Sequence, residues 1–353
     1  MGMGGTIAKG VGGLLAVALF GGGGAVLWAS SARDAVMAKT WEIAPADFPV
    51  PFPLTEDEVA ALRAEKAATL KPPTLPDGTP VLPVDAAGEL LPPPDPLAGV
   101  DLEAVALERA VARGKHLMFS RLGCPECHGE NLAGGVMIDA PPMGTLLGSN
   151  ITTGGVTKGW GPADWDRIVR HGVMHDGHTA VMPAEDYHQL SDRELSDVIA
   201  YARSVPPSDA VVPAPTYGPV MTMLIATENI RPAAYKLDHS KVPPRVPPAE
   251  GPDAAYGAHL AQTCMGCHAM TFAGGPIDGG DPGWPPASNL TPTGTKGWTW
   301  ESFDKALRQG IRNDGEKVRA PMPTRFYASL TEVESKAMWA FLQTVPPAET
   351  GAR

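Results

Sequence analysis

Length, composition and charge narrow the possibilities before any motif is considered. The chain has 353 residues, enough for two domains, and it contains 40 glycines and 38 prolines, well above average usage. Short helices joined by long loops are therefore expected. The formal net charge is −11, and lysines and arginines are not clustered, which argues against a nucleic-acid-binding protein.

The chain begins with an apolar run from Val11 to Ala29, preceded by the single cation Lys9. A run of this length is close to the span of a bilayer core and longer than the apolar region of most signal peptides. Against an anchor, Gly21 to Gly24 weaken a helix, and Ala29-Ser30-Ser31 would suit a cleavage site. Residues 1–34 are predicted to be an N-terminal transmembrane helix or a cleaved signal peptide, and both export the rest of the chain.

Residues 35–100 are predicted to be a Pro-rich linker. Segments such as Pro49-Val50-Pro51-Phe52-Pro53 favour a semi-rigid, extended chain. Within it, Thr55-Glu56-Asp57-Glu58 is typical of a capping box and predicts one short helix. Two interpretations stay open: the linker is a spacer between a bilayer and the following domains, or it packs as ordered coil on the first domain or on a partner.

From about residue 101 the sequence repeats with an offset of 138 to 140 residues. Ser149-Asn150-Ile151-Thr152 returns as Ser288-Asn289-Leu290-Thr291, and Lys158-Gly159-Trp160 returns as Lys296-Gly297-Trp298. Each copy predicts three helices: one before a cysteine motif, a short one near Trp165 or Phe303, and one after a second capping box. The predicted fold is therefore mainly α, with two domains in tandem at 101–207 and 251–353.

Residues 208–250 between the two copies are predicted to be a second Pro-rich connector. Its one apolar stretch, Val220 to Ala226, is too short to span a membrane and is expected to pack on a domain.

All four cysteines lie in two C-x-x-C-H motifs, Cys124-Pro125-Glu126-Cys127-His128 and Cys264-Met265-Gly266-Cys267-His268. This motif attaches haem c: the thiols bond to the two vinyl groups and the adjacent His binds the iron. Two covalently bound haem c groups are therefore predicted, with His128 and His268 as proximal ligands. Zinc binding or dithiol redox chemistry is the alternative use of the motifs.

The distal ligand of the second haem follows by elimination. No His occurs after His268, and the methionines downstream of it are Met270, Met322 and Met338. Met270 is too close to the motif to reach the opposite haem face, and Met338 lies at core spacing on the last predicted helix. Met322, followed by Pro323 in a loop, is the predicted ligand, because proline stiffens the loop.

The first domain has the same arrangement, since Met182 follows His128 by 54 residues, as Met322 follows His268, and also precedes a proline. Met182 is the predicted ligand, and the alternatives are four nearby histidines, His171, His175, His178 and His188. Trp160, Trp298, Asn150 and Asn289 are weaker candidates for the haem edge or a propionate, and Arg170 and Arg308 for a propionate. Ordinary packing is the alternative for these six.

Taken together, the C-x-x-C-H motif, Asn-[Ile/Leu]-Thr, Gly-Trp, Arg-x-Gly, Asp-Gly, Met-Pro and the last capping box resemble class I cytochrome c domains. The two copies are similar to those of the cytochrome c subunits of bacterial membrane-bound alcohol and gluconate dehydrogenases, which generally have three haem domains where this chain has two. The resemblance covers about residues 101–207 and 251–348. It implies a helical fold around each haem, His/Met ligation and one-electron transfer outside the cytoplasmic membrane of a bacterium.

The predicted function is that of a dihaem electron carrier between membrane-associated redox partners, as a subunit or close partner of a respiratory or photosynthetic complex. The chain is not expected to be an enzyme itself, to bind nucleic acid or to take a small-molecule substrate. Its predicted place is the bacterial cytoplasmic membrane, with a single-pass helix and haem domains in the periplasm. The alternative is a dihaem peroxidase, which needs one open haem, and matching methionines in both copies argue against it.

Overall fold

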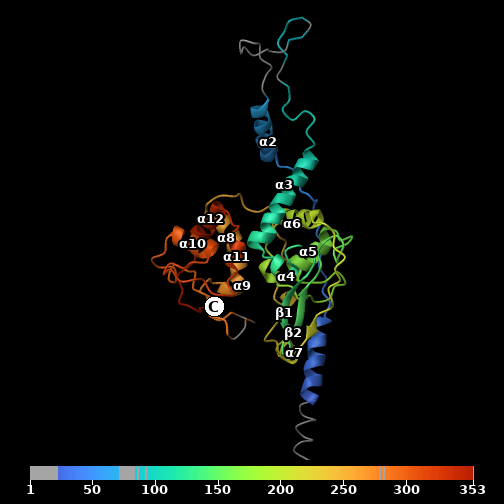
Figure 1. The fold of residues 1–353 in the computed structure, drawn as a ribbon, viewed down its shortest axis with the longest axis vertical. Helices are drawn as coiled ribbons and strands as arrows, with labels where there is room; N and C mark the ends of the chain where they lie inside the picture. Colours follow the sequence, from blue (N-terminus) through green and yellow to red (C-terminus); the bar gives the residue numbers. More distant parts are fainter. Residues whose placement is uncertain are drawn as a thin grey trace, which may run out of the picture.

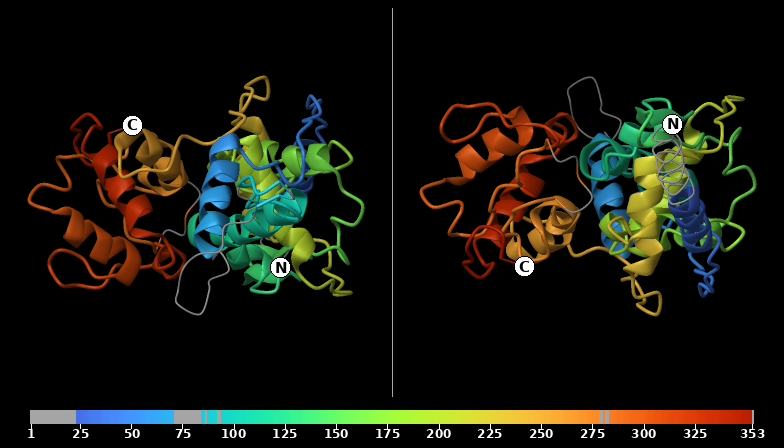
Figure 2. Two further views of the ribbon diagram at one scale, coloured as in Figure 1. Left: turned by 90° about the horizontal axis from the view of Figure 1, so that it is seen from above. Right: turned by 90° about the horizontal axis from the view of Figure 1, so that it is seen from below.

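The computed structural model describes residues 23–70, 84–85, 87–91, 94–277, 280 and 283–352. Two mainly helical domains lie side by side, as the views in Figure 1 and Figure 2 show. Most of the predicted apolar run, from Val11 to residue 22, lies outside the described residues, and residues 23–37 form a helix. Within the described ranges, no helix has both the length and the apolar character to span a membrane.

The first domain is built around a pair of long helices, α3 and α6, that pack on one another. Asp101 begins α3 by accepting hydrogen bonds from the backbone N–H groups of Glu103 and Ala104, and Ser191 with Glu194 forms the predicted capping box of α6. The elements of this domain are α3 (Leu102–His116), the π-helical turn η1 (Leu117–Arg121), α4 (Pro125–His128), β1 (Gly135–Ala140), β2 (Gly144–Gly148), α5 (Pro162–His171), η2 (Ala184–Asp186) and α6 (Asp192–Ser204).

The second domain repeats this plan, with α8 packed on α12. Its last helix begins at the predicted capping box of Thr331 and Glu334. The elements are α8 (Ala254–Leu260), η4 (Ala261–Cys264), α9 (Met265–His268), α10 (Trp300–Gln309), α11 (Thr324–Tyr327) and α12 (Glu332–Leu342). The predicted short helices near Trp165 and Phe303 are α5 and α10.

A glycine sets how closely the helix pair approaches in each domain. A Cβ atom on Gly114 of α3 would lie 1.9 Å from the carbonyl oxygen of Asp197 on α6. The equivalent Gly257 of α8 would place a Cβ 1.9 Å from the carbonyl oxygen of Ala337 on α12. No larger residue fits at either helix crossing, so the two copies share their helix packing as well as their sequence pattern.

The connector and a small sheet cover one end of the first domain. β1 and β2 pair antiparallel, and β3 (Thr216–Tyr217) from the connector extends the sheet in the order β1-β2-β3. The apolar stretch of the connector forms α7 (Pro219–Ala226), which buries Met221 and Ile225 beside Leu146 of β2. This stretch packs on a domain as the sequence predicts, whereas the strands have no clear sequence signal, because Gly135, Gly144 and Gly148 interrupt them.

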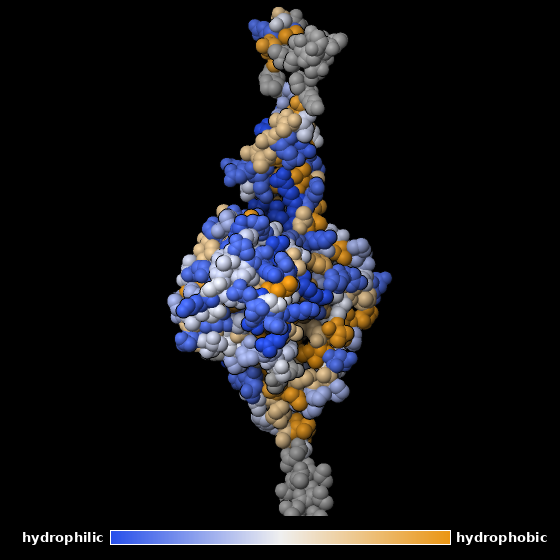
Figure 3. All heavy atoms as spheres, turned by 60° about the vertical axis from the view of Figure 1, so that its left-hand side comes forward, coloured by the Kyte–Doolittle hydropathy of each residue, from blue (hydrophilic) through white to orange (hydrophobic). Residues whose placement is uncertain are grey.

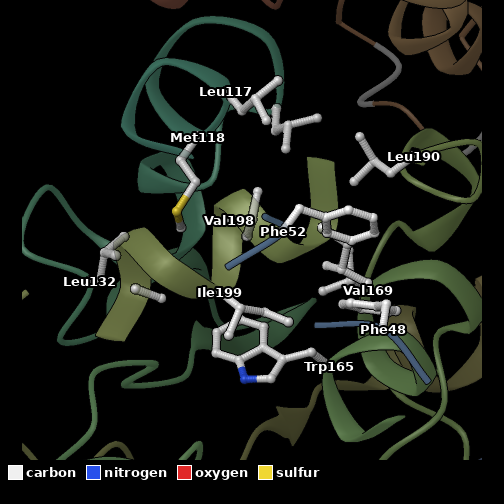
Figure 4. Close-up of a cluster of buried hydrophobic side chains, with 13 residues drawn as sticks. Phe48, Phe52, Leu117, Met118, Leu132, Trp165, Val169, Leu190, Val198 and Ile199 are labelled. Carbon is white, nitrogen blue, oxygen red and sulfur yellow. The ribbon is translucent and has the colours of Figure 1, made fainter. Parts of the chain in front are cut away.

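Part of the N-terminal linker is an integral layer of the first domain. The side chains of Phe48 and Phe52 lie in its buried core, among Val169, Val198 and Trp165 (Figure 4). The Oγ of Ser196 donates a 2.8 Å hydrogen bond to the carbonyl of Pro49. Helix α2 (Glu56–Thr69) then begins at the predicted Thr55 capping box. Residues 39–53 therefore follow the second interpretation of this linker: they form ordered coil that packs on the first domain.

Candidate haem sites

The two motif histidines have the same hydrogen bond on the ring nitrogen that would point away from an iron. The distance from Nδ1 of His128 to the carbonyl oxygen of Ser149 is 2.7 Å, and that from Nδ1 of His268 to the carbonyl oxygen of Ser288 is also 2.7 Å. A carbonyl can only accept, so Nδ1 donates and Nε2 keeps its lone pair. Burial lowers the pKa of both imidazoles, against the opposing effect of these hydrogen bonds. Both rings are therefore prepared to bind a metal through Nε2.

The cysteine thiols have raised pKa values, whereas a reactive dithiol pair has lowered ones. Burial, with the neighbouring thiol as a second cause, raises the pKa of Cys124 and of Cys264 to about 12. Burial and the Glu126 carboxylate raise that of Cys127 to about 11. Redox-active cysteines have lowered pKa values, since the thiolate is the reactive form. Across the described ranges, moreover, no three His, Cys, Asp or Glu side chains are arranged to hold a metal ion.

Each predicted methionine ligand is followed by the same tight turn. The N–H of Ala184 donates a 2.8 Å hydrogen bond to the carbonyl of Met182, across Pro183 at φ −75° and ψ 60°. The N–H of Thr324 donates a 2.9 Å bond to the carbonyl of Met322, across Pro323 at φ −85° and ψ 57°. Both are inverse γ-turns, which fix the chain directly after the thioether.

The second domain contains a cavity of about 690 Å³ lined by Cys264, Cys267, His268 and Met322. The four residues predicted to attach and ligate the second haem therefore border one space. The other walls are largely apolar, including Leu290, Leu307 and Met338, with Trp298 at the same cavity. A cavity of this size, an apolar lining, two thiols and an imidazole with a free Nε2 fit a covalently attached haem.

In the first domain, Cys124 and Met182 both pack against the buried core, together with Ile151 and Trp160. The equivalent Leu290, Trp298 and Met322 pack against the core of the second domain. The first motif is also closely backed by the sheet, because a Cβ on Gly148 of β2 would lie 1.8 Å from the carbonyl oxygen of Cys127. The structure thus places the matched candidates in matched positions.

The four histidines considered as alternatives to Met182 have partners of their own. Nδ1 of His175 lies 2.8 Å from Asp164, and Nδ1 of His178 lies 3.1 Å from Asp176. Nδ1 of His188 donates to the carbonyl of Arg170 at 2.8 Å. The remaining one, His171, is buried with its Nδ1 3.0 Å from Nδ1 of His239 in the connector. These contacts involve Nδ1 and do not decide between the histidines and Met182, so Met182 stays the predicted ligand because it matches Met322 in the second copy.

The side-chain amides of Asn150 and Asn289 form hydrogen bonds within their own domains. Nδ2 of Asn150 donates to the carbonyls of Ser208 and Ala210, and its Oδ1 accepts from the backbone N–H and hydroxyl of Thr152. Asn289 makes the equivalent bonds to Ala348 and to Thr291. These two amides fasten the chain after the last helix to the loop that carries the Ser149 or Ser288 carbonyl. Asn289 also lines the second cavity, so its place at the haem edge stays a prediction.

The suggested propionate role of the two matched arginines has unequal support. Nη1 of Arg170 donates to Asp166 at 2.8 Å and to Asp192 at 3.0 Å, while Nε and Nη2 are buried without a hydrogen-bond partner among the described residues. Arg308 bonds Asp304 at 3.2 Å, its Nε is also buried without a hydrogen-bond partner among the described residues, and it does not line the second cavity. The propionate role stays a prediction for both arginines.

The cavity lining contains charged residues that the sequence did not indicate. Arg312 and Arg319 line the second cavity, and no equivalent arginines exist in the first copy, so the repeat gave no signal for them. Asp186, Tyr187 and Arg121 of the first domain line it as well. Burial and the neighbouring Glu185 carboxylate raise the pKa of Asp186 to about 7. Arg312 and Arg319 are better placed than Arg308 to neutralise haem propionates in the second site.

Two family models match the two halves of the repeat. Residues 96–201 match the family described as cytochrome c oxidase, cbb3-type, subunit III, and residues 254–346 match the cytochrome c family. Both matches fall on the domains that carry the haem-attachment motifs.

Curated proteins similar to the chain are cytochrome subunits of dehydrogenases. The fructose dehydrogenase cytochrome subunit of Gluconobacter japonicus is 35% identical, over 27% of this chain and 22% of its own length. The quinone alcohol dehydrogenase cytochrome c subunit of Gluconacetobacter polyoxogenes is 27% identical, over 71% of this chain and 59% of its own. The gluconate 2-dehydrogenase cytochrome c subunit of Pantoea cypripedii is 32% identical, over 26% of this chain and 23% of its own.

The chain thus spans 22% to 59% of the length of these relatives. Each half has a C-x-x-C-H motif on a short helix, an Nδ1-bonded histidine and a Met-Pro turn, and each half matches one family model. The chain therefore contains two cytochrome c domains in tandem.

Proposed function

We propose that the chain carries two haem c groups and passes electrons one at a time between redox partners, as the cytochrome subunit or close partner of a membrane-associated dehydrogenase or respiratory complex. The observation that carries the proposal is the matched pair of sites. Each has a histidine with a free Nε2 and a methionine on a rigid turn, and in the second site both border one cavity.

A bound haem would supply the one-electron chemistry of its iron, and the protein residues would fix its ligands and surroundings. Cys124, Cys127, Cys264 and Cys267 would form the thioether bonds. His128 with Met182, and His268 with Met322, would ligate the two haem irons. Closed, six-coordinate sites with a thioether ligand are typical of electron transfer at high potential.

The names of the relatives support a dehydrogenase partner. Each relative described above is a cytochrome subunit that works beside a dehydrogenase, so an electron donor of that class suits this chain. On this proposal the chain is not the catalytic subunit. The peroxidase alternative gains no support from these relatives, and a methionine available in both domains leaves no site open for peroxide.

Membrane attachment with the haem domains in the periplasm is part of the same proposal. The apolar run from Val11 to Ala29 leads into the helix of residues 23–37, on which Val26, Leu27 and Trp28 are exposed. The exposed Val220 and Met223 of α7 lie beside this helix, because Arg33 donates a 3.0 Å hydrogen bond to Thr222. Figure 3 shows apolar surface gathered at this end of the molecule.

The test is to purify the full chain after expression with haem-maturation factors. A pyridine haemochrome assay should give two covalent haems per chain. The ferric protein should show the far-red charge-transfer band of methionine ligation for both haems and no high-spin signal. High-spin iron in one site, or peroxide turnover after half-reduction, would favour the peroxidase instead. Purification from solubilised membranes should recover a dehydrogenase with the chain.

A further inference from the structure

The two domains meet through a pair of contacts that repeat with the sequence. Nε2 of His116 on α3 lies 2.9 Å from both carboxylate oxygens of Glu334 on α12. Nε2 of His259 on α8 lies 2.8 Å from Oε1 of Glu194 on α6. His116 and His259 occupy the same place in the two copies, as do the capping-box residues Glu194 and Glu334. The domains therefore dock through the same patch on each, as subunits do about a two-fold axis.

Both contacts involve buried carboxylates that have further hydrogen-bond partners. Glu194, Glu334 and His259 are buried, and both carboxylates also accept hydrogen bonds from their own capping boxes. Arg121 reaches Glu194 at 2.7 Å, so that carboxylate has a cationic partner within its own domain. Burial by itself would raise the pKa of Glu194, but Arg121 and His259 hold it well below its usual value. Removing one partner of such a buried pair leaves a charge without compensation.

The same docking crosses the loops that follow the methionine ligands. Asp186, four residues after Met182, lies over the second motif, because a Cβ on Gly266 would be 2.6 Å from its Oδ1. Arg325, three residues after Met322, donates from Nε to Glu126 inside the first motif at 3.0 Å. Figure 1 shows α9 and α11 on the side of the second domain that faces α4. Each domain thus covers the haem-attachment motif of the other.

As a result, the second haem cavity reaches the first motif. Cys127, which would carry the first haem, lines the same cavity as Cys264, Cys267 and His268, together with Glu126 and Tyr187 of the first domain. A haem bound in this cavity would therefore lie next to Cys127, the attachment point of the other haem, in the cavity wall.

We infer that His116, Glu334, His259 and Glu194 are positioning residues that hold the two haem-attachment motifs against each other, so that an electron passes directly between the two sites. This inference rests on the proposed function. In this step one electron would pass from the site in its reduced form to the site in its oxidised form, with no bond formed or broken. The Asp186 and Arg325 contacts set the register of the two motifs.

The test uses the full chain with both haems. In His116→Ala/His259→Ala, alanine keeps both helices but removes both reciprocal contacts, and the rate of electron equilibration between the haems after photoreduction should fall at least about tenfold. Small-angle X-ray scattering should show a larger radius of gyration. The matched control is Lys336→Gln, which removes the pair with Glu332 on the same helix α12 but no interdomain contact.

A second variant covers the case in which the double alanine variant does not fold. Arg325 and Glu126 are largely exposed, so Arg325→Glu should fold, slow the equilibration, and regain speed when combined with Glu126→Arg. Unchanged rates and unchanged scattering in these variants, with both haems spectroscopically intact, would overturn the inference alone. Loss of methionine ligation in the unmodified chain would overturn the proposed function instead.

Discussion

The first domain is wrapped by segments from outside the repeat, whereas in the described part of the second domain the core comes from the repeat itself. Phe48 and Phe52 of the N-terminal linker complete the first core, and residues 233–239 of the connector pack beside it, with Lys236 bonded to Glu185 at 2.8 Å. The second core surrounds the cavity that Met322 and His268 both line. One repeated plan can therefore carry sites with different surroundings, and the difference predicts that the domains depend on haem to different degrees.

The largest effect should come from removing haem attachment. In Cys264→Ala/Cys267→Ala, the second domain should lose its fold, because its core surrounds a cavity that no side chain of the described residues fills. Cys124→Ala/Cys127→Ala should leave the first domain partly protected, because the linker aromatics remain in its core. Hydrogen exchange across residues 101–207 and 254–346 would measure both. An equal loss of hydrogen-exchange protection in the two variants would show that both domains depend on haem to the same degree.

Removing a linker side chain from the first core should lower the stability of the first domain only. Phe52→Ala deletes a buried ring and should lower the free energy of unfolding of that domain by about 3 kcal/mol. The second domain should be unchanged when its unfolding is followed by its own haem absorbance. Val242→Ala, at a connector side chain that is 87% exposed, is the control and should have almost no effect. An unchanged first domain in Phe52→Ala would mean that the linker is only a loose cover.

The two methionine ligands should respond differently to removal. Met182→Ala and Met322→Ala should each lower the potential of its own haem by on the order of 0.1 V, a modest part of the ~0.8 V that axial ligands span. No histidine follows His268, so the second haem should become high-spin, whereas the first has four histidines nearby that could replace the lost ligand after rearrangement. Redox titration with electron paramagnetic resonance would separate the two cases. Unchanged potentials in either variant would reject that methionine as ligand.

Repetition in the sequence explains what could be predicted. The haem motifs, capping boxes and Met-Pro turns are local signals, and their recurrence predicted the helices and matched candidates that the structure brings together. The roles of Phe48, Asp186 and Arg319 could not be predicted, because each depends on contacts between distant segments and has no counterpart in the other copy. The carbonyls of Ser149 and Ser288 are backbone groups, so no residue type marks their hydrogen bond to the histidine.

The smallest effect concerns pH and separates the two reciprocal contacts. The hydrogen bond to Glu334 raises the pKa of His116 despite the opposing effect of burial, with Glu250 adding to the rise and Arg121 reducing it. Such a contact stabilises docking fully below about pH 6.5 and is lost as the pH rises through the raised pKa. Because His116 is 34% exposed, the loss should stay below about 1 kcal/mol. Glu194 keeps its 2.7 Å pair with Arg121 when His259 is replaced, so His259→Ala should retain the pH dependence that comes from His116, while His116→Ala removes it. Hydrogen exchange at the interface between pH 6 and pH 9 measures it, and an unchanged slope in His116→Ala would assign the titration to another group.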